Sequence, residues 1–383
     1  NKVLLPVLGD HYGRILERGE LRLSCDGGLF VLHYHEHLFP LDPSSLAGFL
    51  GRVAESCGSE ELAFLARSHA RLPRPTVTAR QAVELRHRDK GTLAALLARL
   101  WREEPGTWRA VTEEVERLNG DPDGLDALLE QQNYRLAFWR TASRDLDYRR
   151  FFDIQQLAGL RVEEMEVFRA THDLVIGLVE KGLVQGMRID HPDGLRDPGD
   201  YFRRLRRACP EAWIVAEKIL EPGEELPPDW PIAGTTGYDF LNRVGGLFVD
   251  PRGEEPMSRI YRDFLGEEGG PDATARGCKR QVLSDLLGSE LNRLTSLFVA
   301  VCERHRRHRD YTSYDLNEAL CETAACFPVY RTYFSPAAEE VREEQKASLD
   351  LAVERAREAR HDLDPELFAF LREILLLRIP GEL

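Results

Sequence analysis

Apolar residues near the start of the chain occur in short strand-like runs. The first run covers residues 3–8 and is ended by Gly9 and Asp10. Two further runs, 21–24 and 29–32, flank the sequence Asp-Gly-Gly at 26–28. Consecutive glycines accept positive φ in a tight turn, so this pattern predicts a β-hairpin.

Helical periodicity replaces these runs after the hairpin. It covers 44–56 and 60–71, and from 76 to 143 the chain reads as one helix after another. Together, the hairpin and these helices predict an N-terminal hairpin and helical insertion subdomain over 1–147.

The middle of the chain alternates between strand and helix patterns. The predicted elements are a helix from Thr171 to Lys181, a strand over 184–190, a helix over 200–208, a strand over 213–217 and a possible third strand over 237–241. A strand, a helix and a strand at this spacing are typical of a parallel sheet.

The C-terminal part is again helical, with long amphipathic candidates at 281–302 and 339–360. The predicted fold is therefore α/β, a partial TIM-type (β/α)8 barrel with large helical insertions. Its central barrel part covers 148–255, and a helical subdomain covers 256–383.

The composition of the chain disfavours some classes of binding partner. The chain has 383 residues, is 43% hydrophobic and carries a formal net charge of -14. An acidic balance disfavours a nucleic-acid partner, because phosphate binding depends on Lys and Arg, but it allows a neutral sugar. The chain shows neither an apolar run of about 20 residues nor a signal peptide, so we expect no membrane association.

The seven cysteines lie at scattered spacings without a close pair. This favours reduced thiols in a cytoplasmic protein over a disulfide framework. Alternating His33, His35 and His37 suggest a metal site on one strand face, but no carboxylate-histidine helix motif supports them. A phosphate-binding Gly-rich loop is not found either, so we expect no metal and no cofactor.

Two carboxylates end the two central strands. Asp190 closes the strand that contains Arg188, and Glu217 closes the next strand. In a parallel barrel the active site lies at the C-terminal ends of the strands. Neighbouring strands are about 4.8 Å apart, so these carboxyl groups can approach the ~5–5.5 Å separation of a retaining glycosidase.

The surroundings suggest a role for each carboxylate. Arg188 and Asp190 share a strand face, and a fixed guanidinium would aim an ionised nucleophile. Glu217 follows an apolar strand, and apolar surroundings favour the protonated form that a general acid needs. The alternative is structural: an Arg-x-Asp ion pair on a strand and a surface acid at a strand end.

Several sequence stretches carry a resemblance to a known family. They are Asn1–Gly13, Tyr148–Asp153, Leu157–Glu163, Arg188–Leu195, Ala216–Leu220, Gly234–Phe240 and Ala325–Tyr333. The stretch 186–191, Gly-Met-Arg-Ile-Asp-His, resembles the fourth-strand motif of the α-amylase family, glycoside hydrolase family 13. The stretch 215–217, Val-Ala-Glu, resembles its fifth-strand motif.

The resemblance is closest to members of that family that are isomerases. It implies a retaining intramolecular transglucosylation that turns the reducing-end α-1,4 linkage of a maltooligosaccharide into an α,α-1,1 linkage, with Asp190 as nucleophile and Glu217 as general acid/base. Two alternatives remain, a retaining α-glucan hydrolase or transglycosylase, and a non-catalytic glucan-binding fragment.

The resemblance also implies substrate-binding roles for side chains near these motifs. They are Arg188, His191, Asp193, Lys218, Tyr238, Asp239 and Arg149. Tyr238 could stack on a pyranose face or be a core aromatic. Lys218 could bind a hydroxyl or be a surface charge.

The chain departs from the family pattern in one respect. The family uses a third catalytic carboxylate in a Glu-Asp-Thr context, which this sequence lacks. The first barrel strands would precede Asn1, and later ones would follow Leu383. We therefore expect an internal segment of a longer enzyme, incomplete as a catalyst alone.

Overall fold

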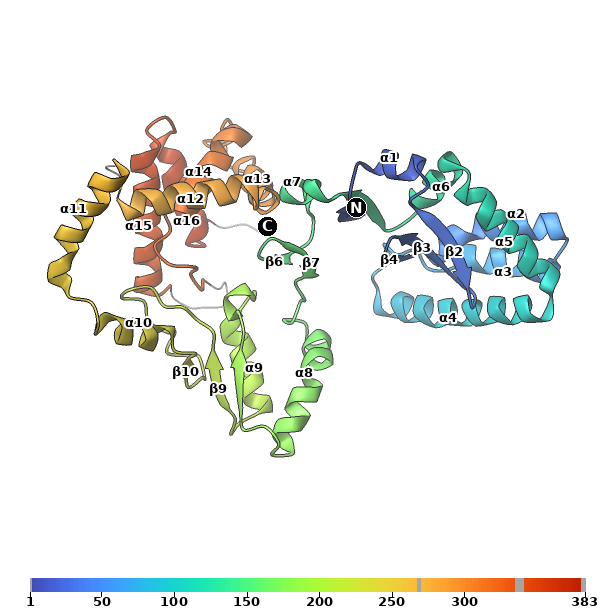
Figure 1. Cartoon of the computed structure of the whole chain (residues 1–383), viewed down its shortest axis with the longest axis horizontal. Coiled ribbons are helices and arrows are strands. Elements are labelled where there is room, and N and C mark those ends of the chain that lie inside the picture. The colour runs from blue at the N-terminus through green and yellow to red at the C-terminus, as the bar shows by residue number, and fades with distance from the viewer. Residues whose placement is uncertain (1, 267–269, 335–340, 380–383) are drawn as a thin grey trace. The chain divides into compact units, whose positions relative to one another are not determined.

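The chain forms two compact units, 1–148 and 149–383, in which helices predominate (Figure 1). The computed structural model describes residues 2–266, 270–334 and 341–379. The first unit has one hydrophobic core and the second unit has two.

The first unit contains a parallel strand pair and an antiparallel meander. Its strands are β1 (Val3–Leu8), β2 (Arg22–Asp26), β3 (Leu29–Tyr34), β4 (His37–Pro40) and β5 (Tyr134–Phe138). The predicted hairpin is confirmed, because β2 pairs antiparallel with β3 through a turn at Gly27 and Gly28. A Cβ on Gly28 would lie 2.1 Å from the carbonyl oxygen of Ala94, so the turn needs glycine there.

The prediction of unbroken helices from 76 to 143 is wrong at β5. This strand pairs in parallel with β1, with Leu5 opposite Leu136. Its partner lies about 130 residues earlier in the chain, so local periodicity does not reveal the pairing. The expected shared face of three histidines is also wrong, because His35 lies in the turn between β3 and β4 with a φ of 50°.

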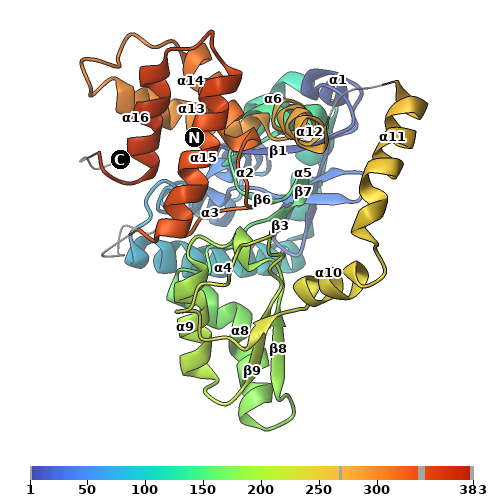
Figure 2. The same cartoon turned by 90° about the vertical axis from the view of Figure 1, so that its left-hand side faces the viewer.

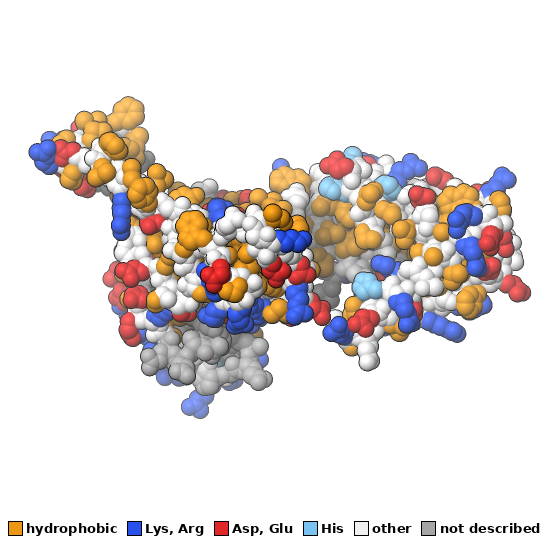
Figure 3. Space-filling model, turned by 90° about the horizontal axis from the view of Figure 1, so that it is seen from below, with side chains coloured by type: hydrophobic (Ala, Val, Ile, Leu, Met, Phe, Trp, Pro, Cys, Tyr) orange, Lys and Arg blue, Asp and Glu red, His pale blue; other side chains and the backbone are white. Residues whose placement is uncertain are grey.

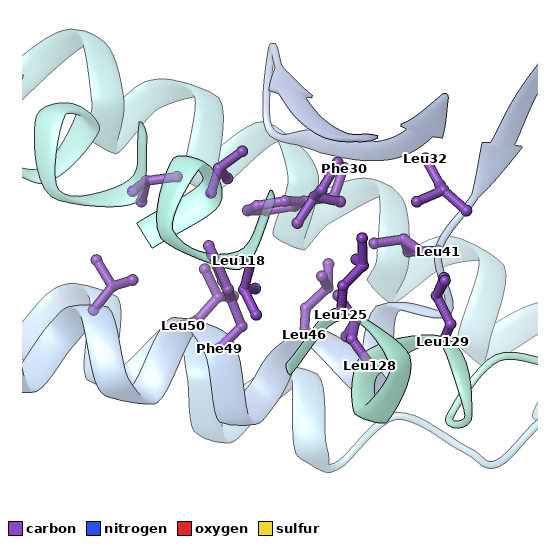
Figure 4. Close-up of a cluster of buried hydrophobic side chains, with 14 of the residues drawn as sticks. Phe30, Leu32, Leu41, Leu46, Phe49, Leu50, Leu118, Leu125, Leu128 and Leu129 are labelled. Atoms are coloured by element: carbon purple, nitrogen blue, oxygen red, sulfur yellow. The ribbon is translucent and has the colours of Figure 1, made fainter. Parts of the chain in front are cut away.

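Helices enclose the core of the first unit. They are α1 (Tyr12–Glu17), α2 (Leu46–Cys57), α3 (Glu60–Ala70), α4 (Arg80–Glu103), α5 (Pro105–Asn119), α6 (Pro122–Leu129) and the short α7 (Ala142–Asp145). Figure 4 shows Phe49 and Leu50 of α2 close to Leu118 of α5, with Phe30 of β3 nearby. Removal of this apolar surface from water is the main stabilising contribution to the unit.

The second unit begins with strands and ends with helices. Its strands are β6 (Arg150–Phe151), β7 (Ile154–Ala158), β8 (Gly186–Ile189), β9 (Trp213–Ala216) and β10 (Gly234–Thr235). Its helices are α8 (Met165–Glu180), α9 (Pro198–Ala208), α10 (Tyr238–Gly246), α11 (Glu254–Leu265), α12 (Pro271–Asp285), α13 (Gly288–Cys302), α14 (Ser313–Ala325), α15 (Glu343–Ala359) and α16 (Pro365–Leu375).

A parallel sheet of order β10-β9-β8 is the centre of this part of the fold. Figures 1 and 2 show α8 and α9 on the same side of it. Ile214 and Ala216 of β9 are fully buried against this layer, together with Phe202 and Leu205 of α9. The predicted order of strand, helix and strand is therefore confirmed, whereas closure into a barrel stays a prediction.

Two predictions in this region are wrong, the start of one helix and the presence of one strand. The helix α8 begins at Met165, and Thr171 lies inside it with its hydroxyl donating to the carbonyl oxygen of Val167 at 2.8 Å. The expected third strand at 237–241 is the start of α10. Gly237 has a φ of 105°, a left-handed conformation that turns the chain from β10 into the helix.

The helical end of the unit has a second hydrophobic core, built by α13 to α16. The predicted single helix over 281–302 is divided, because α12 ends at Asp285 and α13 begins at Gly288. Tyr333 packs against the core beneath the sheet, and the next residue, Phe334, packs against the helical core. This short segment therefore connects the two cores.

The helices α10, α11 and α12 contain no buried residue. Phe248 and Phe264 are more than four-fifths exposed. In Figure 3, hydrophobic side chains crowd the left-hand extremity, where Figure 1 places α11. None of the helices in the described ranges is both long enough and apolar enough to cross a bilayer.

Candidate active site

Asp190 and Glu217 follow directly after the parallel neighbours β8 and β9. The register places Ile189 opposite Ala216, so the two acidic residues occupy the next position on each strand. The backbone N–H of Glu217 donates to the carbonyl oxygen of Ile189 at 2.8 Å, which continues the pairing to this point. The predicted placement of both acidic residues at the C-terminal edge of one parallel sheet is confirmed.

Arg188 contacts both carboxylates. Its Nη1 lies 2.6 Å from Oδ1 of Asp190, and its Nη2 lies 3.9 Å from Oε1 of Glu217. Asp190 is the more open of the two, with 61% of its side chain exposed against 23% for Glu217. One guanidinium therefore orients a solvent-accessible carboxylate beside a half-buried one.

His191 fixes the other oxygen of Glu217. Its backbone N–H donates to Oε2 of Glu217 at 2.8 Å. The residue has a φ of 42°, in the left-handed region that is unfavourable for residues other than glycine. Strain of this kind, of order 1–3 kcal/mol, persists where the surrounding structure enforces it. At His191 the strained backbone directs its own N–H toward the Glu217 carboxylate.

Three aromatic side chains surround the His191 ring. Ring centroids lie at 5.1 Å for Phe151, 5.0 Å for Phe152 and 6.1 Å for Tyr330, whose hydroxyl is 3.2 Å from Nε2 of His191. Phe152 and Tyr330 are both more than half exposed. This aromatic cluster of Phe151, Phe152 and Tyr330 places apolar faces around His191, whose backbone N–H holds Glu217.

Sequence reasoning missed these three residues as site residues, although they lie in stretches that carry the family resemblance. The adjacent aromatic pair Phe151-Phe152, inside one of those stretches, was an available signal. Arg150 is buried and pairs with Glu290 at 3.0 Å, which holds this strand in place.

Asp193 and Lys218, both predicted to bind substrate, are buried. Their side chains are 7% and 0% exposed, and they form an ion pair at 3.3 Å. Lys218 is therefore not a surface charge. Both support the loops that follow β8 and β9.

The remaining predicted binding residues lie around this edge. Tyr238 begins α10 and is 39% exposed, so it is not a core aromatic. Asp239 accepts a hydrogen bond from the Thr235 hydroxyl at 2.5 Å, and this bond lowers the pKa of the carboxyl. Arg149 is exposed. Burial raises the pKa of Tyr330, and the positive charge of Arg149 acts against this shift.

Gly194 makes room for the His191 ring. A Cβ at this position would lie 2.5 Å from Nδ1 of His191, closer than real contacts allow. We expect Gly194→Ala to displace the ring and to lower turnover about tenfold, because overpacking moves neighbouring groups at a cost of about 1–3 kcal/mol. NMR of the His191 ring and steady-state kinetics test this. Gly177→Ala, where a Cβ meets nothing within 4 Å, is the control. An unshifted His191 resonance with parental turnover would contradict the prediction.

The arrangement suits general acid/base and nucleophilic catalysis by the carboxyl groups of Asp190 and Glu217. An open carboxylate held by an arginine can attack, and a second carboxyl beside it can transfer protons. Over the described residues, no group of three His, Cys, Asp or Glu side chains could hold a metal ion.

Comparisons with known proteins support a relation to one group of enzymes. Proteins from two strains of Mycobacterium tuberculosis, each described as a putative maltooligosyl trehalose synthase, are 43% identical over 183 residues, which is 47% of this chain and 24% of theirs. No protein-family model matches the chain.

Solved structures give the same result over nearly the whole chain. The maltooligosyltrehalose synthase from Arthrobacter ramosus aligns with a TM-score of 0.65 and 31% identity, covering 98% of this chain and 36% of its own. The DSM5389 glycosyltrehalose synthase aligns with a TM-score of 0.59 and 25% identity, covering 97% of this chain and 38% of its own. The matched part of the chain spans about a quarter of the length of the curated relatives from Mycobacterium tuberculosis.

Proposed function

Because the chain is related to the maltooligosyltrehalose synthases, we propose that it supplies the nucleophile and the general acid/base of an enzyme that forms a terminal trehalose unit on maltooligosaccharides. The observation that carries this proposal is the placement of Asp190 and Glu217 on neighbouring parallel strands, with Arg188 contacting both.

The first displacement breaks the α-1,4 bond at the reducing end. Asp190 attacks the anomeric carbon of the second glucose and forms a covalent ester, while Glu217 gives its proton to the departing O4 of the terminal glucose. The Arg188 guanidinium keeps Asp190 aimed. The aromatic cluster of Phe151, Phe152 and Tyr330 holds the freed glucose by contact with its apolar face.

The second displacement forms the α,α-1,1 bond. The freed glucose turns so that its anomeric hydroxyl faces the ester. Glu217, now ionised, takes the proton of that hydroxyl, and the oxygen attacks the anomeric carbon as the bond to Asp190 breaks. Two inversions give net retention, and no atom is gained or lost, so the reaction is an isomerisation.

A hydrolytic side reaction is the second candidate, and the exposure of Asp190 favours it. Water that reaches the ester would release glucose and a shorter chain. We also propose a cytoplasmic location, which the seven free cysteines support.

Incubation of the natural gene product with maltopentaose tests the function. Isomerisation removes reducing ends without shortening the chain, hydrolysis creates reducing ends, and binding alone changes neither. We expect loss of most reducing ends with little free glucose. Unchanged maltopentaose would overturn the proposed function.

A further inference from the structure

Lys218 is a buried cation directly after Glu217. Its side chain is fully inaccessible, and its Nζ lies 2.8 Å from Oε1 of Glu224 and 3.3 Å from Oδ2 of Asp193. Among the described residues Nζ has no hydrogen-bond partner, so these contacts are ion pairs. A buried charge is unfavourable unless it is paired, and here one cation lies between two carboxylates.

The pairing joins three separate segments of the chain. Asp193 belongs to the loop after β8, and Lys218 and Glu224 belong to the loop after β9. The third segment contributes Tyr333, whose hydroxyl donates to Oδ1 of Asp193 at 2.5 Å. It also contributes Arg331, whose Nη1 donates to the carbonyl oxygens of Asp193 and Leu195 at 2.8 Å and 2.7 Å.

Each of these segments also carries a group of the site. Glu217 precedes Lys218, and His191, whose N–H holds Glu217, lies two residues before Asp193. Tyr330, which contacts the His191 ring, lies three residues before Tyr333. The buried charges therefore hold the backbone on both sides of the Glu217 carboxyl group.

We propose that Lys218 is a positioning residue for Glu217 and does not touch the sugar. This inference rests on the proposed function. In that function Glu217 acts twice, first as an acid toward O4 and then as a base toward the anomeric hydroxyl. A carboxyl group that must serve two oxygens in turn needs a fixed place, because a misplacement of about 1 Å can cost about 100-fold in rate.

The test uses steady-state kinetics of the natural gene product on maltopentaose. We expect Lys218→Met to lower kcat about 100-fold with little change in KM, because the substrate contacts remain. The ratio of free glucose to isomerised product should rise, since a loosely held Glu217 activates the returning glucose less well and water competes. A stabilising role alone would not move this ratio.

Tyr333→Phe serves as a milder variant in case Lys218→Met does not fold. It removes only the hydroxyl that holds Asp193, and we expect it to lower kcat and raise the glucose ratio in the same direction. If both residues act through one network, the double variant will lose less than the product of the two single losses. Lys181→Met, at an exposed lysine after α8, should match the parent.

Failure of the proposed function and failure of the positioning role of Lys218 give different results. A parent that leaves maltopentaose unchanged overturns the proposed function and the positioning role together. An active parent with a folded Lys218→Met that keeps kcat and the glucose ratio overturns the positioning role alone. A rise in KM without a fall in kcat, with Tyr333→Phe unaffected, would also overturn it and show direct sugar binding by Lys218. If Lys218→Met does not fold, an unaffected Tyr333→Phe overturns the proposal.

Discussion

Asp190→Asn should lower the turnover of maltopentaose by on the order of 10⁴-fold, the scale seen when a member of a catalytic set is lost. The amide cannot form the ester, and it loses the ionic contact with Arg188 at 2.6 Å. Binding should persist, because the aromatic cluster is untouched. Steady-state kinetics and calorimetric titration with maltopentaose measure the two effects.

Asp173→Asn is the matched control for this variant. Asp173 is exposed on α8, and its substitution should leave turnover unchanged. Trapping of the intermediate gives a second readout. The parent enzyme, quenched by denaturation during turnover, should carry a glycosyl ester on Asp190 that mass spectrometry detects. An ester on another residue would disprove the nucleophile assignment.

Glu217→Gln should lower kcat by about 10³-fold and leave affinity for the glucan close to that of the parent. General acid/base catalysis by one side chain typically contributes 10²–10⁴-fold, and the amide supplies neither an acidic proton nor a base. The substitution nearly preserves shape, so the His191 N–H can still donate to the side-chain oxygen. Measurement of kcat, and of binding by calorimetry, separates the two quantities.

Glu211→Gln provides the comparison at the opposite end of the same strand. Glu211 is exposed before the start of β9, whereas Glu217 follows its end. Only the substitution at the C-terminal end should affect the chemistry. A Glu217→Gln variant within about tenfold of the parent would mean that another group supplies the proton.

The central sheet and its two acidic residues could be predicted from local pattern. Strand, helix and strand follow one another between Gly186 and Ala216, so Asp190 and Glu217 had to share one edge if the strands were parallel neighbours. The contact of Arg188 with Asp190 follows from their spacing of two residues on one strand.

Contacts between distant segments could not be predicted in this way. Tyr330 meets His191 across 139 positions, and β5 meets β1 across about 130. The left-handed backbone at His191 depends on the loop around it, and its residue type gave little indication of that conformation. The burial of Lys218 depends likewise on Glu224 and Asp193, which surround its Nζ only after the loops fold.

The two adjacent residues that pack into different cores have a thermodynamic consequence. Tyr333 belongs to the core beneath the sheet and Phe334 to the helical core, so separation of either core strains the other through two neighbouring side chains. Local opening of α13 to α16 would therefore withdraw Tyr333 from Asp193. By linkage, a sugar that binds only the intact sheet edge increases the free energy of that opening, and amide protons in the distant helices exchange more slowly when the site is occupied.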